Sequence, residues 1–310
     1  MISMQHLPTP HLEKLNATLE NSKLPKEDIP RIELAIKRYK EWVVELSAVD
    51  EDKNTEEIVQ EMVMLLNQYR SFLDLEIIFD SDNDFLYRQK GQIKLDNSVI
   101  EEFLPHLIQK CVLSDVHDDS IFLGPKKAFS SLYFTSTLDD AMVSGGIHVR
   151  TKDQDFTVAR RVYMKTSYSP KFEQYESKNF YIAYVAAECK TNLDKTMFQE
   201  ASATANDVKS SLKGSKYYLL CEWLDMTPQS TAATSIDEVL ILRRAKRMNS
   251  NIRSKFGKAL GRKSNRQSYV DFLNNSPFDV SVFERLVTLI SGLVSIEDPI
   301  EDDVLKRGYF

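Results

Sequence analysis

The chain has 310 residues, of which 42% are hydrophobic and 10% aromatic, so it can bury a large core and has the composition of a globular protein. Its three cysteines are widely spaced and form no C-x-x-C pair, which argues against a disulfide framework or a zinc site. No apolar run approaches the roughly 18 residues of a membrane span. The N-terminus lacks a signal-peptide pattern. We therefore expect a cytoplasmic protein.

Residues 1–117 are predicted to be mainly helical. In residues 29–46 and 58–72 the apolar side chains recur every three or four positions, which is the period of an amphipathic helix. A short charged turn separates the two segments, so we expect an antiparallel helical hairpin. We interpret its apolar stripe as protein core, with a dimerisation seam as the alternative.

Two capping boxes are predicted in this region. Asn54 with Glu57 precedes the second helix of the hairpin, and Ser98 with Glu101 precedes a short helix further on.

Residues 118–248 are predicted to form an α/β core. Short runs of β-branched or aromatic residues are bounded there by Gly, Ser or Asp, as strands commonly are. These runs cover residues 121–123, 132–134, 147–149, 156–164, 181–187, 216–223 and 239–242. Residues 196–212 have a helical pattern. The order of elements predicts a mixed sheet with helices on its faces. Residues 249–310 are predicted to be a basic helical region with an acidic tail.

A basic segment stands out against the formal net charge of −6. Between Val239 and Val270 there is no acidic residue but there are ten basic ones: Arg243, Arg244, Lys246, Arg247, Arg253, Lys255, Lys258, Arg262, Lys263 and Arg266. Such asymmetry favours a surface that binds a polyanion, and a solvated helix face is the alternative. Because phosphate contacts and base contacts cannot be separated by sequence alone, these cations are candidates for both.

Glu188-Cys189-Lys190 is the candidate catalytic motif. On a strand, residues i and i+2 share a face, so Glu188 and Lys190 project together from the end of the buried run 181–187. Two charges at that place are costly unless they are compensated, and a bound divalent metal would compensate them. The same acid-x-Lys spacing occurs at three other places, which we assign to polar loops or a helix: Glu51-Asp52-Lys53, Glu176-Ser177-Lys178 and Asp207-Val208-Lys209.

A second carboxylate is expected from the neighbouring strand. Asp155 lies directly at the start of the predicted strand 156–164, and Asp153 is the alternative. Two close carboxylates are suited to a hard cation such as Mg²⁺. A turn role is the simpler explanation for either aspartate taken alone.

These residues resemble the PD-(D/E)XK nuclease superfamily, with Asp155, Glu188 and Lys190 at the motif positions. The run from Glu188 to Ala201 is similar to that of BbvCI-type restriction endonucleases, as are the segments 152–156 and 218–226. The resemblance covers about residues 120–250. The chain departs from the superfamily motif because no proline precedes Asp155.

The resemblance implies Mg²⁺-dependent hydrolysis of double-stranded DNA that leaves 5′-phosphate ends. The metal ligands would be Asp155, Glu188 and the backbone carbonyl of Cys189, and Lys190 would act on the attacking water or on the charged phosphate. Candidate DNA-binding residues are Asn192, Lys195, Arg243, Arg244, Lys246, Arg247, Arg253 and Lys255. For Asn192, helix capping is an equally good explanation.

The sequence therefore predicts a sequence-specific type II restriction endonuclease. Cutting both strands requires two active sites, so we expect a homodimer or a heterodimer with a related subunit. The alternatives are a repair or mobile-element nuclease of low specificity and a DNA-binding protein whose nuclease core is inactive.

Overall fold

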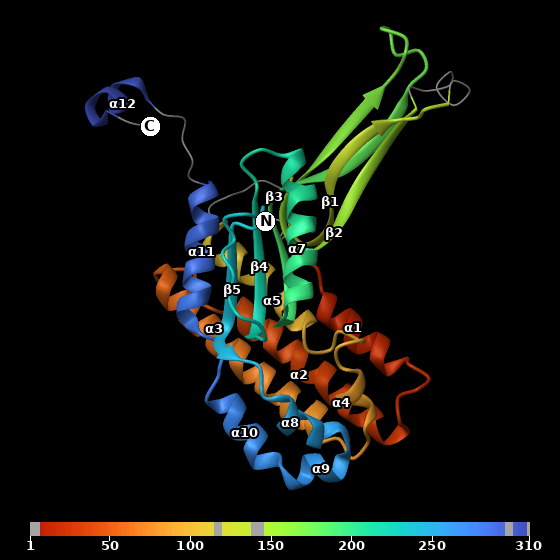
Figure 1. Ribbon diagram of the computed structural model, residues 1–310, viewed down its shortest axis with the longest axis vertical. Helices are drawn as coiled ribbons and strands as arrows, with labels where there is room; N and C mark the ends of the chain where they lie inside the picture. Colours follow the sequence, from red (N-terminus) through yellow and green to blue (C-terminus); the bar gives the residue numbers. More distant parts are fainter. Residues whose placement is uncertain (1–6, 115–119, 138–145, 295–299, 309–310) are drawn as a thin grey trace.

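The N-terminal region of the protein is a layer of helices that packs beneath a mixed sheet (Figure 1). The computed structural model describes residues 7–114, 120–137, 146–294 and 300–308. The helical layer consists of α1 (Pro10–Leu19), η1 (Lys26–Asp28), α2 (Ile29–Ser47), α3 (Thr55–Phe72), η2 (Leu73–Phe79), α4 (Phe85–Gln89) and α5 (Ser98–Cys111). The predicted pair of amphipathic helices corresponds to α2 and α3, which pack against each other.

Only one of the two predicted capping boxes forms. The Asn54 side chain accepts a hydrogen bond from the Glu57 N–H, and the Glu57 carboxylate accepts one from the Asn54 N–H. Ser98 instead lies inside α5, and its hydroxyl donates to the Lys94 carbonyl at 2.6 Å. Glu101 turns toward the Lys94 ammonium, so the second box is replaced by contacts that become important below.

Five strands form one sheet in the order β1-β2-β3-β4-β5. They are β1 (Ile121–Phe134), β2 (Ile147–Thr166), β3 (Glu176–Leu193), β4 (Lys216–Leu224) and β5 (Glu238–Lys246). The first three strands are antiparallel neighbours, whereas β3, β4 and β5 run parallel. Parallel neighbours need a crossover, and α7 (Lys195–Ser211) supplies it between β3 and β4. The predicted α/β fold is thus confirmed.

The parallel half of the sheet is covered on both faces, which explains its continuous apolar sequence. On β4, Tyr217 and Leu219 pack with the face of α7 that carries Ala201 and Ala205. The alternate residues Tyr218 and Leu220 belong to the core shared with the N-terminal helices. The Glu188-Cys189-Lys190 motif on β3 is therefore held between two helical layers.

The antiparallel strands are longer than the sequence predicts. Residues 121–123 and 132–134 belong to one strand, β1, and residues 147–149 and 156–164 belong to β2. The polar residues between those apolar runs still pair with the neighbouring strand, because this part of the sheet projects from the body and is partly open to solvent (Figure 1). Asp155 is consequently inside β2 and not at its start, and Glu188 and Lys190 lie before the end of β3.

The C-terminal region returns to the N-terminal helices. Its elements are α8 (Ser250–Arg253), η3 (Ser254–Gly257), α9 (Ala259–Ser264), α10 (Arg266–Asn274), α11 (Val280–Val294) and α12 (Glu301–Arg307). Phe256 and Tyr269 pack with Phe79 of η2, while α11 packs against α3 and β5. No described helix is long and apolar enough to cross a membrane.

Candidate active site

Strand register brings Asp155 and Glu188 together. Phe156 of β2 pairs with Ala187 of β3, so the next residues along each strand, Asp155 and Glu188, are neighbours. Asp155 Oδ2 accepts a hydrogen bond of 2.9 Å from the Cys189 N–H, which fixes the carboxylate at the motif. Asp153 pairs with Lys127 on the other side of β2 and is exposed.

Glu188 and Lys190 contact each other on one face of β3, as strand geometry predicts. The Lys190 Nζ is 2.6 Å from Glu188 Oε1, and the Tyr217 hydroxyl of β4 donates to Glu188 Oε2 at 3.0 Å. Partial burial opposes the charge of Lys190, but the hydrogen bond with Glu188 and the negative charges of Glu188 and Asp155 together raise the Lys190 pKa. Lys190 is therefore a cation, suited to stabilising negative charge.

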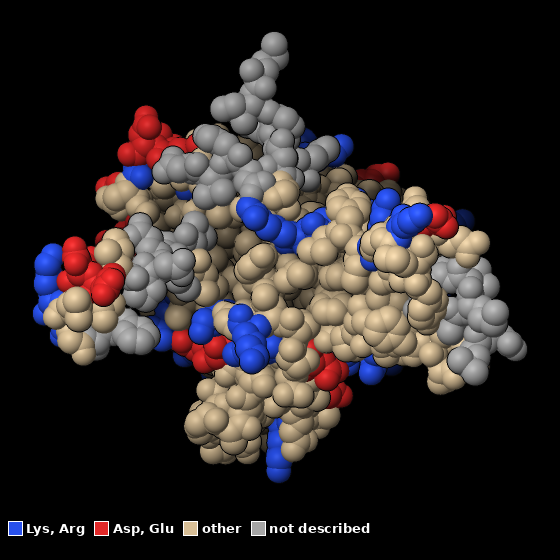
Figure 2. Space-filling view, turned by 90° about the horizontal axis from the view of Figure 1, so that it is seen from above, with Lys and Arg blue, Asp and Glu red and all other residues tan. Residues whose placement is uncertain are grey.

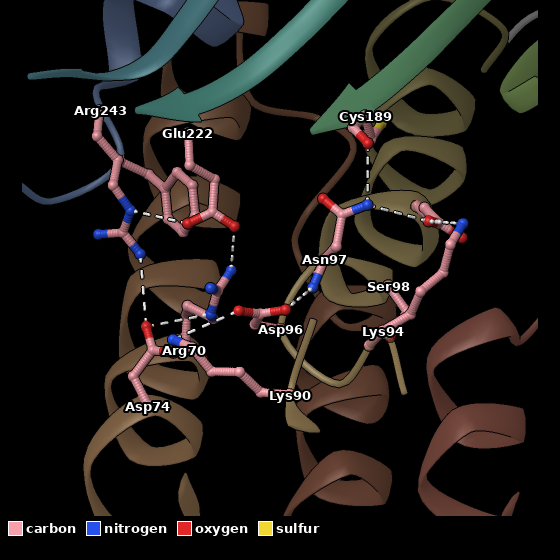
Figure 3. Close-up of polar contacts among 12 residues, drawn as sticks. Arg70, Asp74, Lys90, Lys94, Asp96, Asn97, Ser98, Cys189, Glu222 and Arg243 are labelled. Carbon is pink, nitrogen blue, oxygen red and sulfur yellow. Dashed lines mark hydrogen bonds and ion pairs between the residues drawn. The ribbon is translucent and has the colours of Figure 1, made fainter. Parts of the chain in front are cut away.

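A second group of polar residues reaches the same place from the segment before α5 and from α5 itself (Figure 3). The Lys94 Nζ is 3.2 Å from Asp155 Oδ1 and 3.2 Å from Glu101 Oε1. The Asn97 amide donates to the Cys189 carbonyl at 2.9 Å and to Glu101 Oε1 at 3.3 Å. Sequence analysis did not connect these three residues with the motif. The only signal was the Ser98–Glu101 spacing, which indicates a helix start and says nothing about β3.

Behind the motif, Arg243 takes part in a buried charge network (Figure 3). Glu222 Oε1 is 2.6 Å from Arg70 Nη1, and Glu222 Oε2 is 3.2 Å from Arg243 Nε. Asp74 lies 3.2 Å from Arg70 on the same side. Arg243 is only 6% exposed and also donates to the Ser276 carbonyl, so its position does not suit the DNA contact expected from the sequence.

Most other cations of the basic segment have partners within the chain. Arg244 pairs with Asp279, and Arg247 pairs with Asp225. Four further cations of the segment meet aspartates that follow η2. These pairs are Lys258 and Arg262 with Asp84, Lys263 with Asp82, and Arg266 with Asp80.

The acid-free pattern thus has an intramolecular explanation, because it matches an acidic segment elsewhere in the chain. Figure 2 views the molecule from the end opposite α8, α9 and α10, and on that face too Lys and Arg lie among Asp and Glu. Among the described residues, Lys246 and Lys255 are exposed members of the segment that form no ion pair. Arg253 is partly buried and donates to the Met248 carbonyl.

The two remaining candidates for DNA contact lie at the end of β3 and directly after it. Lys195 is the exposed first residue of α7, whose cap is Asp194, the residue that accepts from the Met197 N–H at 2.9 Å. Asn192 is half-buried and lines a cavity of about 460 Å³ together with Thr191, Trp223 and Arg253. This cavity is therefore next to the end of β3.

Comparison with known proteins places the chain in a family and supports its fold. Residues 92–310 match the family model described as Bpu10I restriction endonuclease. The fold is similar to a solved structure titled "native BbvCI A2B2 tetramer at low resolution", with a TM-score of 0.58 and 21% sequence identity over 84% of this chain and 94% of that chain. No curated protein matches the sequence.

Proposed function

Because the chain belongs to the Bpu10I restriction endonuclease family, we propose that it is a type II enzyme that cuts double-stranded DNA at a specific sequence, uses Mg²⁺ and leaves 5′-phosphate ends. The observation that carries the proposal is the meeting of Asp155, Glu188 and Lys190 on two adjacent strands. Two carboxylates beside one ammonium form a group that can act on a phosphodiester in the DNA backbone.

The donor atoms at the site fit Mg²⁺. Asp155, Glu188 and the Cys189 carbonyl offer only oxygen ligands, which hard cations prefer. Among the described residues, no three acidic, His or Cys side chains converge on one point. Mg²⁺ does not need such a cluster, because it is usually held by one or two carboxylates with water and substrate phosphates. When bound, the ion would supply an activated water and neutralise charge on the scissile phosphate.

The remaining chemistry belongs to the chain itself. Lys190, held as a cation by Glu188, would stabilise the negative charge that grows on the phosphate as the nucleophile attacks. Tyr217 holds Glu188 by its hydroxyl, so it orients the carboxylate without reacting. Asn97 and the Asp155 carboxylate fix the two sides of the Cys189 backbone.

Double-strand cleavage needs a second active site. The solved BbvCI structure to which the fold is similar is an A2B2 tetramer. By analogy, we propose that this chain works with a second copy or with a related subunit, each cutting one strand.

The proposal is tested by Glu188→Ala and Lys190→Ala, assayed for plasmid cleavage with Mg²⁺ and for DNA binding by gel shift. We expect both variants to lose cleavage and retain binding, because the motif acts on the phosphate and the DNA contacts lie elsewhere. Glu176→Ala and Lys178→Ala are matched controls, since this second acid-x-Lys pair is also on β3 and also forms an ion pair. Full activity of the Glu188 and Lys190 variants would refute the assignment.

The wild-type plasmid assay also separates the rival functions. Discrete fragments support a sequence-specific enzyme. A smear or random nicking supports a nuclease of low specificity. A gel shift without cleavage supports a DNA-binding protein with an inactive core.

A further inference from the structure

The ammonium of Lys94 lies between two carboxylates that come from different elements. Its Nζ is 3.2 Å from Asp155 Oδ1 on β2 and 3.2 Å from Glu101 Oε1 on α5. Its side chain is 44% exposed, so Lys94 is not a core residue, and solvent can reach the position that its ammonium occupies. A cation coordinated by two carboxylate oxygens is the arrangement that a divalent metal ion also adopts.

The backbone at Lys94 is held in an uncommon conformation. Lys94 has a φ of 51°, in the left-handed region that non-glycine residues rarely occupy. The Ser98 hydroxyl and the Ser98 N–H both donate to the Lys94 carbonyl, at 2.6 and 3.2 Å, and help to hold this turn. Unfavourable backbone geometry is often found at functional sites. Here the turn directs the Lys94 side chain to Asp155.

The other Asp155 oxygen and the Glu188 carboxylate have partners within the sheet. Asp155 Oδ2 accepts from the Cys189 N–H, while Glu188 is held by Lys190 and Tyr217. Among the described residues, Asp155 Oδ1 has no partner in the sheet, so it is the Asp155 oxygen that a metal ion would take, and it is the one that Lys94 contacts. Two cations cannot share that oxygen at close range without strong repulsion.

We propose that Lys94 occupies a cation position between Asp155 and Glu101, so that a divalent metal ion binds there only by displacing the Lys94 ammonium and gains Glu101 as a ligand. Lys94 thereby sets the affinity of the site for metal. This inference rests on the metal dependence proposed above, and the experiment distinguishes the failure of one from the failure of the other.

The test is calorimetric titration of the full-length protein with Mn²⁺ in the absence of DNA. Lys94→Met removes the competing charge and leaves both carboxylates in place, so we expect its dissociation constant for Mn²⁺ to fall about tenfold or more. Lys94→Arg retains a cation that can span two carboxylates and should bind Mn²⁺ no more tightly than the wild type. Glu101→Gln should bind Mn²⁺ more weakly than the wild type. Lys94→Gln repeats the first measurement if Lys94→Met folds poorly.

Lys152→Met is the matched control. Lys152 is also on β2, three residues from Asp155, but its ammonium pairs with Asp207 at 2.8 Å. Equal tightening in Lys152→Met and Lys94→Met would show a general charge effect and overturn the inference. If the wild type and Lys94→Met bind Mn²⁺ equally tightly, the inference about Lys94 is overturned but the proposed metal site is not. If neither protein binds Mn²⁺, the proposed metal site fails as well.

Discussion

Asp153 and Asp155 are two residues apart on β2, and their different environments come from strand pairing. Asp155 contacts the Cys189 N–H on β3, whereas Asp153 pairs with Lys127 on β1. Sequence alone left both open as the second carboxylate, because either could have ended a loop. Register with β3 is a long-range property, so only the folded sheet separates them.

This difference predicts opposite outcomes for two isosteric substitutions. Asp155→Asn removes a charge beside Glu188 and should lower the rate of plasmid cleavage by at least about 100-fold. Asp153→Asn should cleave at the wild-type rate, since its side chain is exposed. Rates measured under single-turnover conditions with saturating Mg²⁺ check this. A larger loss of cleavage in Asp153→Asn than in Asp155→Asn would show that Asp153, and not Asp155, is the second carboxylate.

The motif on β3 is predictable from the sequence, but its local pattern is not unique. Glu188 and Lys190 follow a buried apolar run, whereas the sequence predicts a loop for the pair Glu176 and Lys178. That assignment was wrong, since Glu176 and Lys178 also lie on β3 and form an ion pair. What separates the two pairs is the neighbouring Asp155, which a local pattern does not contain.

At the scale of elements, α5 both packs against the sheet and carries two glutamates with different roles. One face of it carries Glu101 to the candidate active site, and the next residue, Glu102, is fully buried among the N-terminal helices. Glu102 accepts hydrogen bonds from the Tyr39 hydroxyl and from the His11 N–H at 2.8 Å. Burial raises the pKa of Glu102 to about 7, although these hydrogen bonds act in the opposite direction.

The raised pKa predicts how Glu102 links stability to pH. Because the folded protein binds this proton more tightly than the unfolded chain, the contribution is complete below the ordinary pKa of 4.5 and is lost as the pH rises toward 7. Between pH 5 and 7, the free energy of unfolding of the wild type should therefore fall by about 1 kcal/mol per pH unit relative to Glu102→Gln. Urea unfolding at several pH values measures this difference.

Glu33→Gln provides the control for that series, because Glu33 is an exposed carboxylate on α2. It should show no such trend relative to the wild type. A constant difference between the wild type and Glu102→Gln over the same range would contradict the prediction.

The periodicity of apolar residues predicts where helices and strands lie better than it predicts how long the strands are. The hairpin of α2 and α3 was predicted from its apolar spacing, since each helix buries one stripe against a common core. The long strands β1 and β2 were predicted as separate pieces, because their central residues are polar and pair in a part of the sheet that is open to solvent. The periodicity of apolar residues reports which side chains are buried. Strand residues that pair through the backbone but remain exposed to solvent therefore show no such pattern.

For the whole molecule, the main departure from expectation concerns the basic segment. Its lack of acidic residues favoured a DNA-binding surface, but the matching acids lie far earlier in the sequence, at Asp80, Asp82 and Asp84. Charge complementarity thus joins the C-terminal helices to the segment after η2. A count of charges along the chain cannot distinguish this internal match from an external partner.

The surviving candidates for phosphate contact can be tested by salt dependence. Lys255 is exposed and forms no ion pair among the described residues, whereas Lys263 is 65% exposed but pairs with Asp82 at 2.6 Å. Lys255→Ala should reduce the slope of log binding constant against log salt concentration by about one, because one phosphate contact is lost. Lys263→Ala should leave that slope unchanged. An equal reduction in both variants would mean that the internal pair does not keep Lys263 from DNA.

The positions of the two tryptophans give the protein a pair of separate optical reporters. Trp42 is fully buried among the N-terminal helices and stacks on Tyr69 at 4.6 Å, whereas Trp223 stacks on Phe272 and lines the cavity beyond β3. With Phe at position 42, emission would come only from the cavity wall, and with Phe at position 223 only from the helical layer. Fluorescence could then follow in real time whether the C-terminal helices undock from the end of β4 before the N-terminal helices unfold.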